Sequence, residues 1–364
     1  MEPSVPKFIV ETSKPVAYES KDHTNPRGTS SDNSRNPLFN RKMAALYPDR
    51  SLRILDLGCA GGAFVKDCFD AGHIPIGLEG SDHNLKTKRA EWARIPEHLF
   101  TADIVEPFSI HEHDYDSKRL FQANIVTAWE LMEHLKEADI PRLAANVMKH
   151  LAPGGIWIMS VADYPDIHEG INYHQTVQKK EWWIKRLLDC GFRHQPTIAD
   201  FFRYDWIRGP LQASSSFHLV VNRDGDPLPP IPQNFQFPPQ LMFESAIYFL
   251  SEAIQRKGPW LSYIWYSILL IRDLLNVHPR HADIHYVLAY AYGLSGRYFE
   301  CHQEAHFALQ LDPNHESSLK LISELGDFRT NQHRLGQVPT EIDSTGDAGP
   351  APKLSESEPA PILK

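Results

Sequence analysis

The sequence has little cysteine and no excess of positive charge. Its four cysteines form no closely spaced pair: Cys59, Cys68, Cys190 and Cys301. This scatter argues against a disulfide framework and the usual zinc motifs, and it is typical of the reducing cytoplasm. Lysine and arginine together number 37 against 46 acidic side chains, a formal net charge of −9. Because affinity for nucleic acid rests mainly on basic side chains, we expect no nucleic-acid partner.

A long hydrophobic run is also missing. The most apolar window, residues 260–271, is far shorter than the ~20 residues that a membrane span requires. The first residues lack the basic start and the apolar core of a signal peptide. We therefore expect a soluble, cytoplasmic protein with no membrane partner.

What the chain does have is a glycine-rich turn between an apolar run and a helical pattern. The apolar run predicts a short buried strand over residues 53–57, and residues 64–69 repeat at helical spacing. Gly58 allows the backbone to turn at the end of the strand, and Gly61 and Gly62 leave room for a ligand. Strand, turn and helix predict the first unit of a nucleotide-type α/β fold.

Two acidic residues indicate which ligand this turn accepts. The glycine spacing of a dinucleotide site is absent, because Ala60 and Ala63 occupy its second and third positions. Asp56 precedes the turn, and a carboxylate there suits a ligand with an ammonium group better than a pyrophosphate. Glu79 ends the next apolar run, 21 residues after Gly58, where an acidic side chain can accept hydrogen bonds from both ribose hydroxyls.

Through these residues the chain resembles the class I S-adenosylmethionine-dependent methyltransferases over about residues 50–222. The first motif of that family is an acidic residue followed by three alternating glycines, and Ala60 replaces the middle glycine. The resemblance implies S-adenosylmethionine as the cofactor, Glu79 at its ribose and Asp103 next to its adenine. The cofactor-binding residues that it implies are Asp56, Gly58, Cys59, Ala60, Gly61, Glu79, Gly80, Asp103, Ile104 and Trp129.

The order of apolar runs predicts an α/β domain over residues 49–223. Strand and helix patterns alternate there, which is typical of a mostly parallel sheet. The resemblance implies a Rossmann-like sheet of seven strands with an antiparallel last strand. We expect the sixth and seventh strands at 197–202 and 217–222.

The segment before the first strand, residues 1–48, is polar for most of its length. Its composition alone predicts a loop, and a surface leader is one interpretation. In the methyltransferase family such segments often fold over the cofactor as a lid. On that second interpretation, substrate contacts are expected from Tyr18, His23, Asn25 and Asn33.

Beyond a proline-rich linker, residues 224–238, the sequence becomes helical. Pro279 and Pro313 are 34 residues apart, which is the tetratricopeptide period. Residues 239–327 thus resemble a short tetratricopeptide module with one good and one degenerate repeat. Such a module buries its face only against a neighbour, so a protein partner is one expectation. The tail, residues 328–364, has the composition of a disordered segment.

Methyl transfer to a hydroxyl or an amine requires a group that accepts the proton. Our candidates for this catalytic role follow the fourth and fifth strands. They are His174, His134 and Glu130, with Glu133, Asp163 and His168 as further candidates. A neutral imidazole is the natural base near pH 7, which favours His174. The structural alternatives are a loop hydrogen bond for His174 and a helix cap for Glu130.

Metal binding is the weaker hypothesis. Four polar side chains lie close together in one loop: Asp163, Asp166, His168 and Glu169. Polar loops commonly have this composition without an ion, and the histidines show no H-E-x-x-H spacing. We therefore predict no metal ligands.

The expected function is methyl transfer to a small molecule, with a sugar or sugar-nucleotide hydroxyl as the suggested acceptor. Two alternatives stay open: a protein methyltransferase whose substrate is held by the helical module, and a non-catalytic scaffold that retains the cofactor. Methylation of DNA is not expected, because residues 127–130 lack the Asn-Pro-Pro-aromatic motif of the DNA amino-methylating enzymes.

Overall fold

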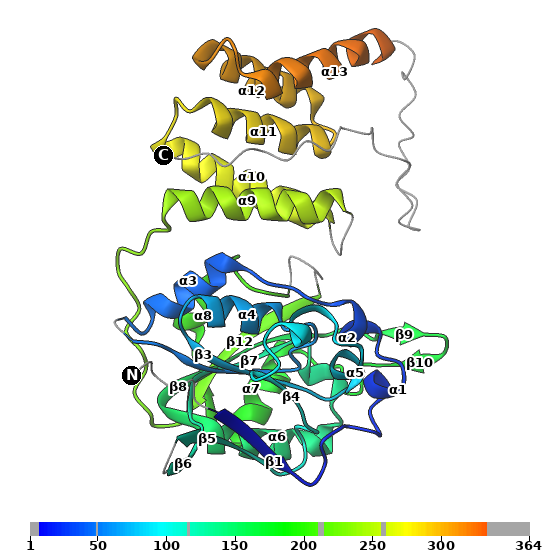
Figure 1. Cartoon of the computed structure of the whole chain (residues 1–364), viewed down its shortest axis with the longest axis vertical. Helices are drawn as coiled ribbons and strands as arrows, with labels where there is room; N and C mark the ends of the chain where they lie inside the picture. Colours follow the sequence, from blue (N-terminus) through cyan, green and yellow to red (C-terminus); the bar gives the residue numbers. More distant parts are fainter. Residues whose placement is uncertain (1–6, 49, 115–116, 210–214, 256–259, 333–364) are drawn as a thin grey trace. The chain divides into compact units, whose positions relative to one another are not determined.

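The computed structural model describes residues 7–48, 50–114, 117–209, 215–255 and 260–332. The chain divides into two compact units, Met1–Gln236 and Phe237–Lys364 (Figure 1). The predicted tail begins inside the last described helix, α13 (Glu316–Gln332). The rest of that tail lies outside the described residues.

Seven strands form the central sheet of the first unit. In chain order they are β2 (Arg53–Leu57), β3 (Ile74–Glu79), β4 (Leu99–Thr101), β7 (Ala123–Trp129), β8 (Leu151–Ala162), β11 (Phe192–His194) and β12 (Ser216–Arg223). Their spatial order is β11-β12-β8-β7-β2-β3-β4. Strands β4, β3, β2, β7 and β8 are parallel, and β12 is antiparallel to both β8 and β11. The predicted mostly parallel sheet with an antiparallel last strand is confirmed.

Helices cover both faces of this sheet. They are α3 (Pro37–Ala45), α4 (Ala63–Asp70), α6 (Ile140–His150), α7 (Lys180–Asp189) and α8 (Pro196–Phe202), with a short α5 (His83–Thr87) and the 3-10 turns η1 (Ala90–Ala93), η2 (Met132–His134) and η3 (Glu137–Asp139). Leu55 and Leu57 of β2 join a core with α6 and α7, whereas Ile54 joins a core with α3, α4 and α8. Successive side chains of a strand point to opposite faces, so an apolar run with no alternation builds a strand buried on both sides.

The expected sixth strand is wrong. Residues 197–202 lie in helix α8, and the sixth strand is the earlier and shorter β11. Pro196 is the first residue of α8, a position that suits its fixed φ angle and its missing N–H. Ile198 and Phe202, four residues apart, are both buried, which is the spacing of a helical face. The seventh strand lies where it was expected.

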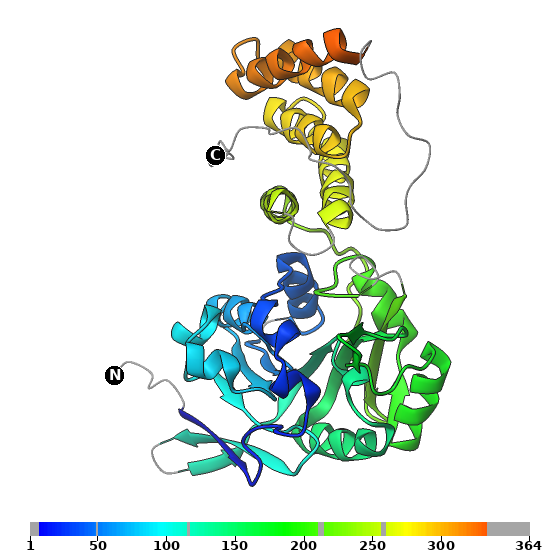
Figure 2. The same cartoon turned by 90° about the vertical axis from the view of Figure 1, so that its right-hand side faces the viewer.

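The leader contains regular structure of its own. Strand β1 (Lys7–Thr12) pairs with β5 (Phe108–Asp114), which pairs in turn with β6 (Ser117–Leu120), so a second, antiparallel sheet forms. Two short helices follow, α1 (Lys21–Thr24) and α2 (Arg27–Ser31). Figure 2 shows this leader, in blue, passing in front of the central sheet on its way to α3.

The second unit is a stack of antiparallel helices. They are α9 (Pro239–Ile254), α10 (Trp260–Val277), α11 (Ala282–Leu294), α12 (Tyr298–Leu311) and α13, and each packs against the next. Pro279 follows α10 and Pro313 follows α12, so the two prolines occupy corresponding turns. Cys301 and Ala308 of α12 are fully buried. The helical nature of this unit is as expected, and its tetratricopeptide character stays a prediction.

Among the helices described, none combines the length and the apolar character needed to cross a membrane.

Candidate active site

The glycine-rich turn between β2 and α4 has left-handed backbone at three positions. Gly58, Ala60 and Gly62 have φ angles of 72°, 43° and 88°. Glycine adopts this conformation without steric cost, whereas for alanine it costs about 1–2 kcal/mol. The replacement of the middle glycine by Ala60 therefore leaves the turn intact, but with strain that other contacts must offset.

Glu79, at the end of β3, supplies the first of these contacts. Its Oε2 accepts a hydrogen bond from the backbone N–H of Ala60 at 2.9 Å. Its Oε1 accepts from the backbone N–H of Ser81 at 3.2 Å and from the Thr29 hydroxyl at 3.3 Å. Burial raises the pKa of Glu79, although these donors oppose the shift. This buried carboxylate is thus fully partnered and fixes the turn beside it.

The carbonyl of Ala60 is held from the other side. It accepts hydrogen bonds from the Trp92 indole N–H at 2.7 Å and from Asn84 Nδ2 at 2.8 Å. Neither residue was predicted, because α5 and η1 carry no motif that links them to the turn. Both polar groups of the strained Ala60 peptide are consequently bonded to buried side chains.

Asp56 is buried in β2, next to the turn. Its Oδ1 accepts a hydrogen bond from the Thr127 hydroxyl at 2.6 Å. Burial raises the pKa of Asp56 to about 7, against the effect of the Thr127 hydrogen bond. A cation close to this carboxyl would favour its ionised form, as the sequence-based role at an ammonium group requires.

Three other expected cofactor residues are Cys59, within the turn itself, and Gly80 and Asp103, just after β3 and β4. Cys59 packs over Gly77, where a Cβ atom would lie only 2.8 Å from the Cys59 sulfur. The carbonyl of Gly80 accepts from the backbone N–H of Ala17, and the N–H of Asp103 donates to the carbonyl of Lys14, each at 2.9 Å. Their bonds thus run to the leader.

Ile104 and Trp129 belong to the apolar cores instead. Ile104 is buried in the core with α6, and its carbonyl accepts from Asn146 Nδ2 at 2.9 Å. Trp129 lies edge-on to Phe39 of α3, with ring centroids 5.0 Å apart. Contact of these two residues with a cofactor stays a prediction.

The leader lies directly on the glycine-rich turn. Asn33 Oδ1 accepts from the backbone N–H of Ala63 at 3.0 Å. A Cβ atom on Gly61 would lie 2.3 Å from that same oxygen. The space at Gly61, which the sequence analysis attributed to a ligand, is therefore used by the leader. Thr29 reaches Glu79 from the same segment, so the leader covers the turn rather than running free on the surface.

A second cluster lies at the ends of β7 and β8. Glu130 has a φ angle of 49°, and its backbone N–H donates to Ser160 Oγ at 2.9 Å while its Oε2 accepts from Ser216 Oγ, also at 2.9 Å. Glu133, in η2, is fully buried, and neither of its carboxylate oxygens has a hydrogen-bond partner among the described residues. Burial, together with the neighbouring Glu130, raises the pKa of Glu133, although His134 and the nearby backbone N–H groups of Glu133 and Ala162 oppose the shift.

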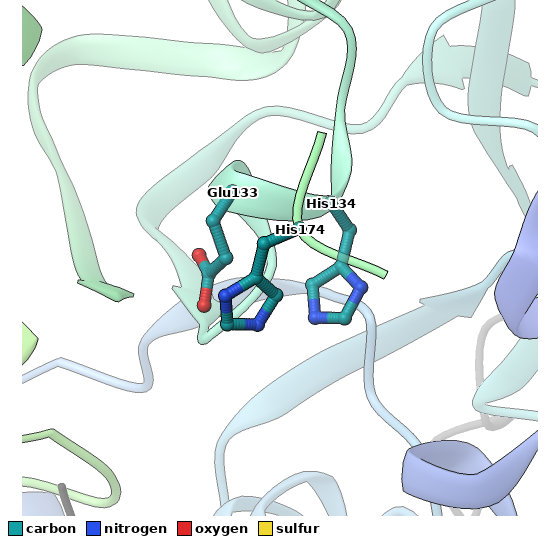
Figure 3. Close-up of side chains that lie close together, drawn as sticks. All are labelled: Glu133, His134 and His174. Atoms are coloured by element: carbon teal, nitrogen blue, oxygen red, sulfur yellow. The ribbon is translucent and has the colours of Figure 1, made fainter. Parts of the chain in front are cut away.

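Two imidazoles complete this cluster (Figure 3). The rings of His134 and His174 lie edge to face, with centroids 4.9 Å apart. His174 Nδ1 is 2.5 Å from the carbonyl oxygen of Tyr164. Because a carbonyl can only accept, Nδ1 carries the proton in the neutral ring and Nε2 carries the lone pair. Burial lowers the pKa of His174, which favours this neutral form.

His134 is held by the leader. Its Nδ1 is 3.0 Å from Asp22 Oδ2 in α1. Burial opposes a charge on His134, but the hydrogen bond and the negative charge of Asp22 outweigh it, so the pKa of His134 is raised. Asn25, also in the leader, donates from Nδ2 to the Tyr173 hydroxyl at 2.8 Å. One segment therefore reaches both the glycine-rich turn and the imidazole pair.

The sequence did not predict the partners that orient this cluster. Asp22 is 112 residues from His134 in the chain, and the Tyr164 partner is a backbone carbonyl, which residue type does not reveal. Glu133 is among the further candidates for the base, but the sequence does not predict its burial. Of the expected leader contacts, His23 lies 3.4 Å from Ser81 Oγ, while Tyr18 is largely exposed and packs edge-on to His23.

A family model matches part of the first unit. Residues 33–203 match the family model of a methyltransferase domain. The match agrees with the strand order and with the methyl donor that the sequence resemblance implied. The matched segment includes β2, the glycine-rich turn and the ends of β7 and β8.

Curated proteins with a similar sequence include O-methyltransferases. Ubiquinone biosynthesis O-methyltransferases are 30% identical over 122 residues in Brucella ovis and 27% identical over 125 residues in Thiobacillus denitrificans. These alignments cover 34% of this chain in both cases, and 46% and 49% of the respective relative. The chain thus spans about half the length of the curated relatives that it matches.

Solved structures with a similar fold include two methyltransferases with bound ligands. The glycopeptide N-methyltransferase MtfA complexed with S-adenosyl-L-homocysteine is 15% identical, with 53% of this chain and 92% of that chain covered and a TM-score of 0.38. S-adenosylmethionine-bound CalS10, an amino pentose methyltransferase from Micromonospora echinaspora, is 19% identical, with 51% and 88% covered and a TM-score of 0.34. TM-scores this low carry no argument, so the description of the fold rests on the strand order.

Proposed function

We propose that the first unit transfers a methyl group from S-adenosylmethionine to a hydroxyl group of a small molecule. One observation carries this proposal: the leader bonds both to the glycine-rich turn, through Thr29 and Glu79, and to the imidazole pair, through Asp22 and His134. A methyl donor at the first place and an acceptor at the second would be covered by one segment. Such closure aligns the reacting groups and excludes water.

The residues of the turn fit the donor. Glu79 is a buried acceptor at the end of β3, and one of its three donors is the Thr29 hydroxyl of the leader. A ribose hydroxyl can replace that hydroxyl without leaving the carboxylate unpartnered. Asp56 supplies a carboxyl for the ammonium group, and the positive φ angle at Gly58 carries the backbone around the ligand. Exchange of Thr29 for ribose also gives the leader the role of a lid.

The imidazole pair supplies the acceptor chemistry. S-adenosylmethionine provides a methyl group on a sulfonium, so the chain need not activate the leaving group. His174 holds its Nε2 lone pair ready by donating from Nδ1 to the Tyr164 carbonyl, and we assign it as the general base. As the acceptor oxygen bonds to the methyl carbon, the carbon–sulfur bond breaks and the acceptor proton passes to Nε2. His134 and Glu130 orient the acceptor from the same cluster.

The acceptor class is proposed from chemistry and from the relatives' names. The curated relatives are named as O-methyltransferases, which favours an oxygen acceptor. A sugar or sugar-nucleotide hydroxyl remains our proposed acceptor, and a phenol is the rival. Incubation of the whole chain with S-adenosylmethionine and a panel of sugars, sugar nucleotides and phenols tests this. Formation of S-adenosylhomocysteine with a sugar is expected, whereas turnover with phenols alone would reject the sugar.

A second candidate function uses the helical unit to hold a protein substrate. Exposed aromatic side chains favour it, since Phe299 and Trp265 are 67% and 49% exposed. Substitution of Phe299 by alanine should then weaken methylation of a protein substrate and leave small acceptors unaffected. Equal rates of protein methylation before and after this change would exclude a role of the helical unit in holding the protein substrate. A chain that binds S-adenosylmethionine and releases no S-adenosylhomocysteine with any acceptor would be the scaffold alternative.

A further inference from the structure

We propose that Glu133, His134 and His174 form a binding site for a divalent transition-metal ion, and that the ion binds the acceptor oxygen. This inference rests on the proposed methyl transfer and deepens it. It also departs from the expectation of no metal ligands. The sequence could not reveal this site, because His134 and His174 are 40 residues apart. Only the fold brings them together.

The geometry of the three side chains suits one ion. Each offers a ligand atom, and these atoms all lie within 4.8 Å of one another. Two ligands bonded at about 2.1 Å to one ion are at most about 4.2 Å apart, so a small side-chain adjustment closes the set. In Figure 3 the Glu133 carboxylate lies beside the His174 ring, and a nitrogen of each imidazole is turned toward the other ring.

The two segments that carry the ligands are bonded to each other. The backbone N–H groups of Gln175 and Thr176 donate to the carbonyl of Glu133, at 2.7 Å and 3.0 Å. The Thr176 hydroxyl donates to the carbonyl of Leu135 at 2.7 Å. The loop of His174 is therefore fastened to η2, and the ligand set sits on a fixed frame rather than on two independent loops.

Glu133 is the side chain that most needs an ion. It is fully buried, and neither oxygen has a hydrogen-bond partner among the described residues. A buried carboxyl group without a partner is costly, and a buried charge is normally paired or bound to a metal. A cation at this position would supply a charged partner for this carboxylate.

Both histidines are oriented as metal ligands usually are. Their Nδ1 atoms are engaged by Asp22 Oδ2 and by the Tyr164 carbonyl, which leaves Nε2 of each ring without a hydrogen-bond partner in the described part of the chain. A carboxylate or carbonyl on the far nitrogen fixes the tautomer and the ring orientation of a metal-binding histidine. Neither partner could be predicted from the sequence.

The ligand types select the ion and its role. Two imidazoles and one carboxylate suit Mn²⁺, Fe²⁺, Co²⁺ or Zn²⁺ better than Mg²⁺ or Ca²⁺, which prefer oxygen ligands. Three protein ligands leave positions open for an acceptor oxygen. The ion would lower the pKa of the acceptor hydroxyl, its proton would pass to solvent, and the oxygen would take the methyl group as the carbon–sulfur bond breaks. In the metal-loaded protein His174 is then a ligand, and it is the base only without metal.

Among the described residues, the polar side chains of residues 163–169 do not form a comparable set of metal ligands. Within the described residues, Asp163 bonds Lys179 at 2.6 Å and Asp166 bonds His168 at 2.9 Å. These carboxylates already have partners at the surface. His168 therefore provides a matched control, since it is a histidine of the same segment outside the proposed ligand set.

Titration of the chelator-treated whole chain with Co²⁺ tests the site, followed by visible absorption and by calorimetry. We expect one ion per chain, an absorption band of bound Co²⁺, and at least tenfold weaker binding in Glu133→Gln, His134→Ala and His174→Ala. Asp22→Asn should weaken binding by about 10–100-fold, and His168→Ala should bind as the wild type does. Circular dichroism confirms that each variant is folded. The inference would be overturned if the wild type bound no Co²⁺, or if Glu133→Gln and His174→Ala bound Co²⁺ as tightly as the wild type does.

Binding of S-adenosylmethionine to the same metal-free protein separates the two proposals. Retained cofactor binding without any Co²⁺ binding rejects the ion site and leaves the proposed methyl transfer. Co²⁺ binding without cofactor binding supports the ion site and rejects the methyl transfer on which its role rests.

Discussion

Two buried glutamates of the first unit differ in what surrounds them. Glu79 accepts hydrogen bonds from two backbone N–H groups and the Thr29 hydroxyl. Glu133 is even more buried and accepts none from the described residues. A satisfied buried acid has a structural reason to be there, whereas an unsatisfied one indicates a missing ligand. In the proposed function, Glu79 belongs to the cofactor end of the site and Glu133 to the reacting end.

The largest expected effect is at the reacting end. His174→Ala should lower turnover at least about 100-fold, because it removes a ligand of the metal-loaded protein and the general base of the metal-free one. The affinity for S-adenosylmethionine should change by less than about threefold, since His174 does not touch the glycine-rich turn. Rates of S-adenosylhomocysteine release and calorimetry measure the two quantities. His168→Ala is the matched control, and equal loss of turnover in it would contradict the assignment.

Stability separates the two glutamates next. Glu79→Gln should lower the free energy of unfolding by about 1–3 kcal/mol, because the amide cannot serve all three donors and leaves buried groups unpaired. Glu133→Gln should leave it unchanged or raise it in metal-free buffer, since it replaces an unpartnered acid. Urea unfolding of both variants measures the difference. A larger loss in Glu133→Gln than in Glu79→Gln would reverse the comparison.

The affinity for S-adenosylmethionine should also distinguish Glu79 from Glu133. Glu79→Gln should weaken S-adenosylmethionine binding at least roughly tenfold, about what the loss of a charge-assisted hydrogen-bond pair costs. In Glu133→Gln the dissociation constant should stay within about threefold of the wild type. Calorimetry on the two variants, after metal removal, gives both values. If the two changes weaken binding equally, Glu79 has no special role at the ribose.

The acidic residue of β2 adds a pH dependence at the cofactor end. The pKa of Asp56 is raised to about 7 by burial, above its unfolded value, so its contribution to stability is present at low pH and is lost as the pH rises through about 7. Binding an ammonium group reverses this preference, because it favours the ionised form. Affinity should therefore rise several-fold from pH 6 to pH 7.5, and Asp56→Asn should remove the dependence. A wild-type affinity that is flat over this range would contradict the role of Asp56.

The smallest effect concerns the strained turn. Ala60→Gly should raise the free energy of unfolding by up to about 1 kcal/mol, because glycine relieves the positive φ angle at 43° while adding backbone entropy to the unfolded chain. The turn stays braced through Glu79, Asn84 and Trp92, so cofactor affinity should change little. Thermal unfolding measures the first quantity. A destabilised variant would mean that the methyl group of Ala60 contributes packing that outweighs its strain.

The sequence predicted what periodicity and turn chemistry encode. The glycine-rich turn, Asp56 and Glu79 were readable because they follow apolar runs at fixed spacing. Residues 197–202 were misassigned because a six-residue apolar run fits a strand and a helix alike. The proline at its start was the signal that favoured the helix.

The rest depends on contacts between distant segments. Asp22 meets His134 and Thr29 meets Glu79 only because the leader folds back over the sheet. No local pattern marks a residue for such a contact, and a loop-like composition concealed the leader's structure. Glu133 became distinct from Glu130 only once burial and hydrogen-bond partners were known.

Calorimetric titration of the intact chain with S-adenosylmethionine at pH 7.5 tests the central claim most directly. We predict saturable binding of one molecule per chain in the wild type and a dissociation constant about tenfold higher in Glu79→Gln. Absence of binding by the folded wild-type chain would contradict the assignment of the glycine-rich turn as the cofactor site.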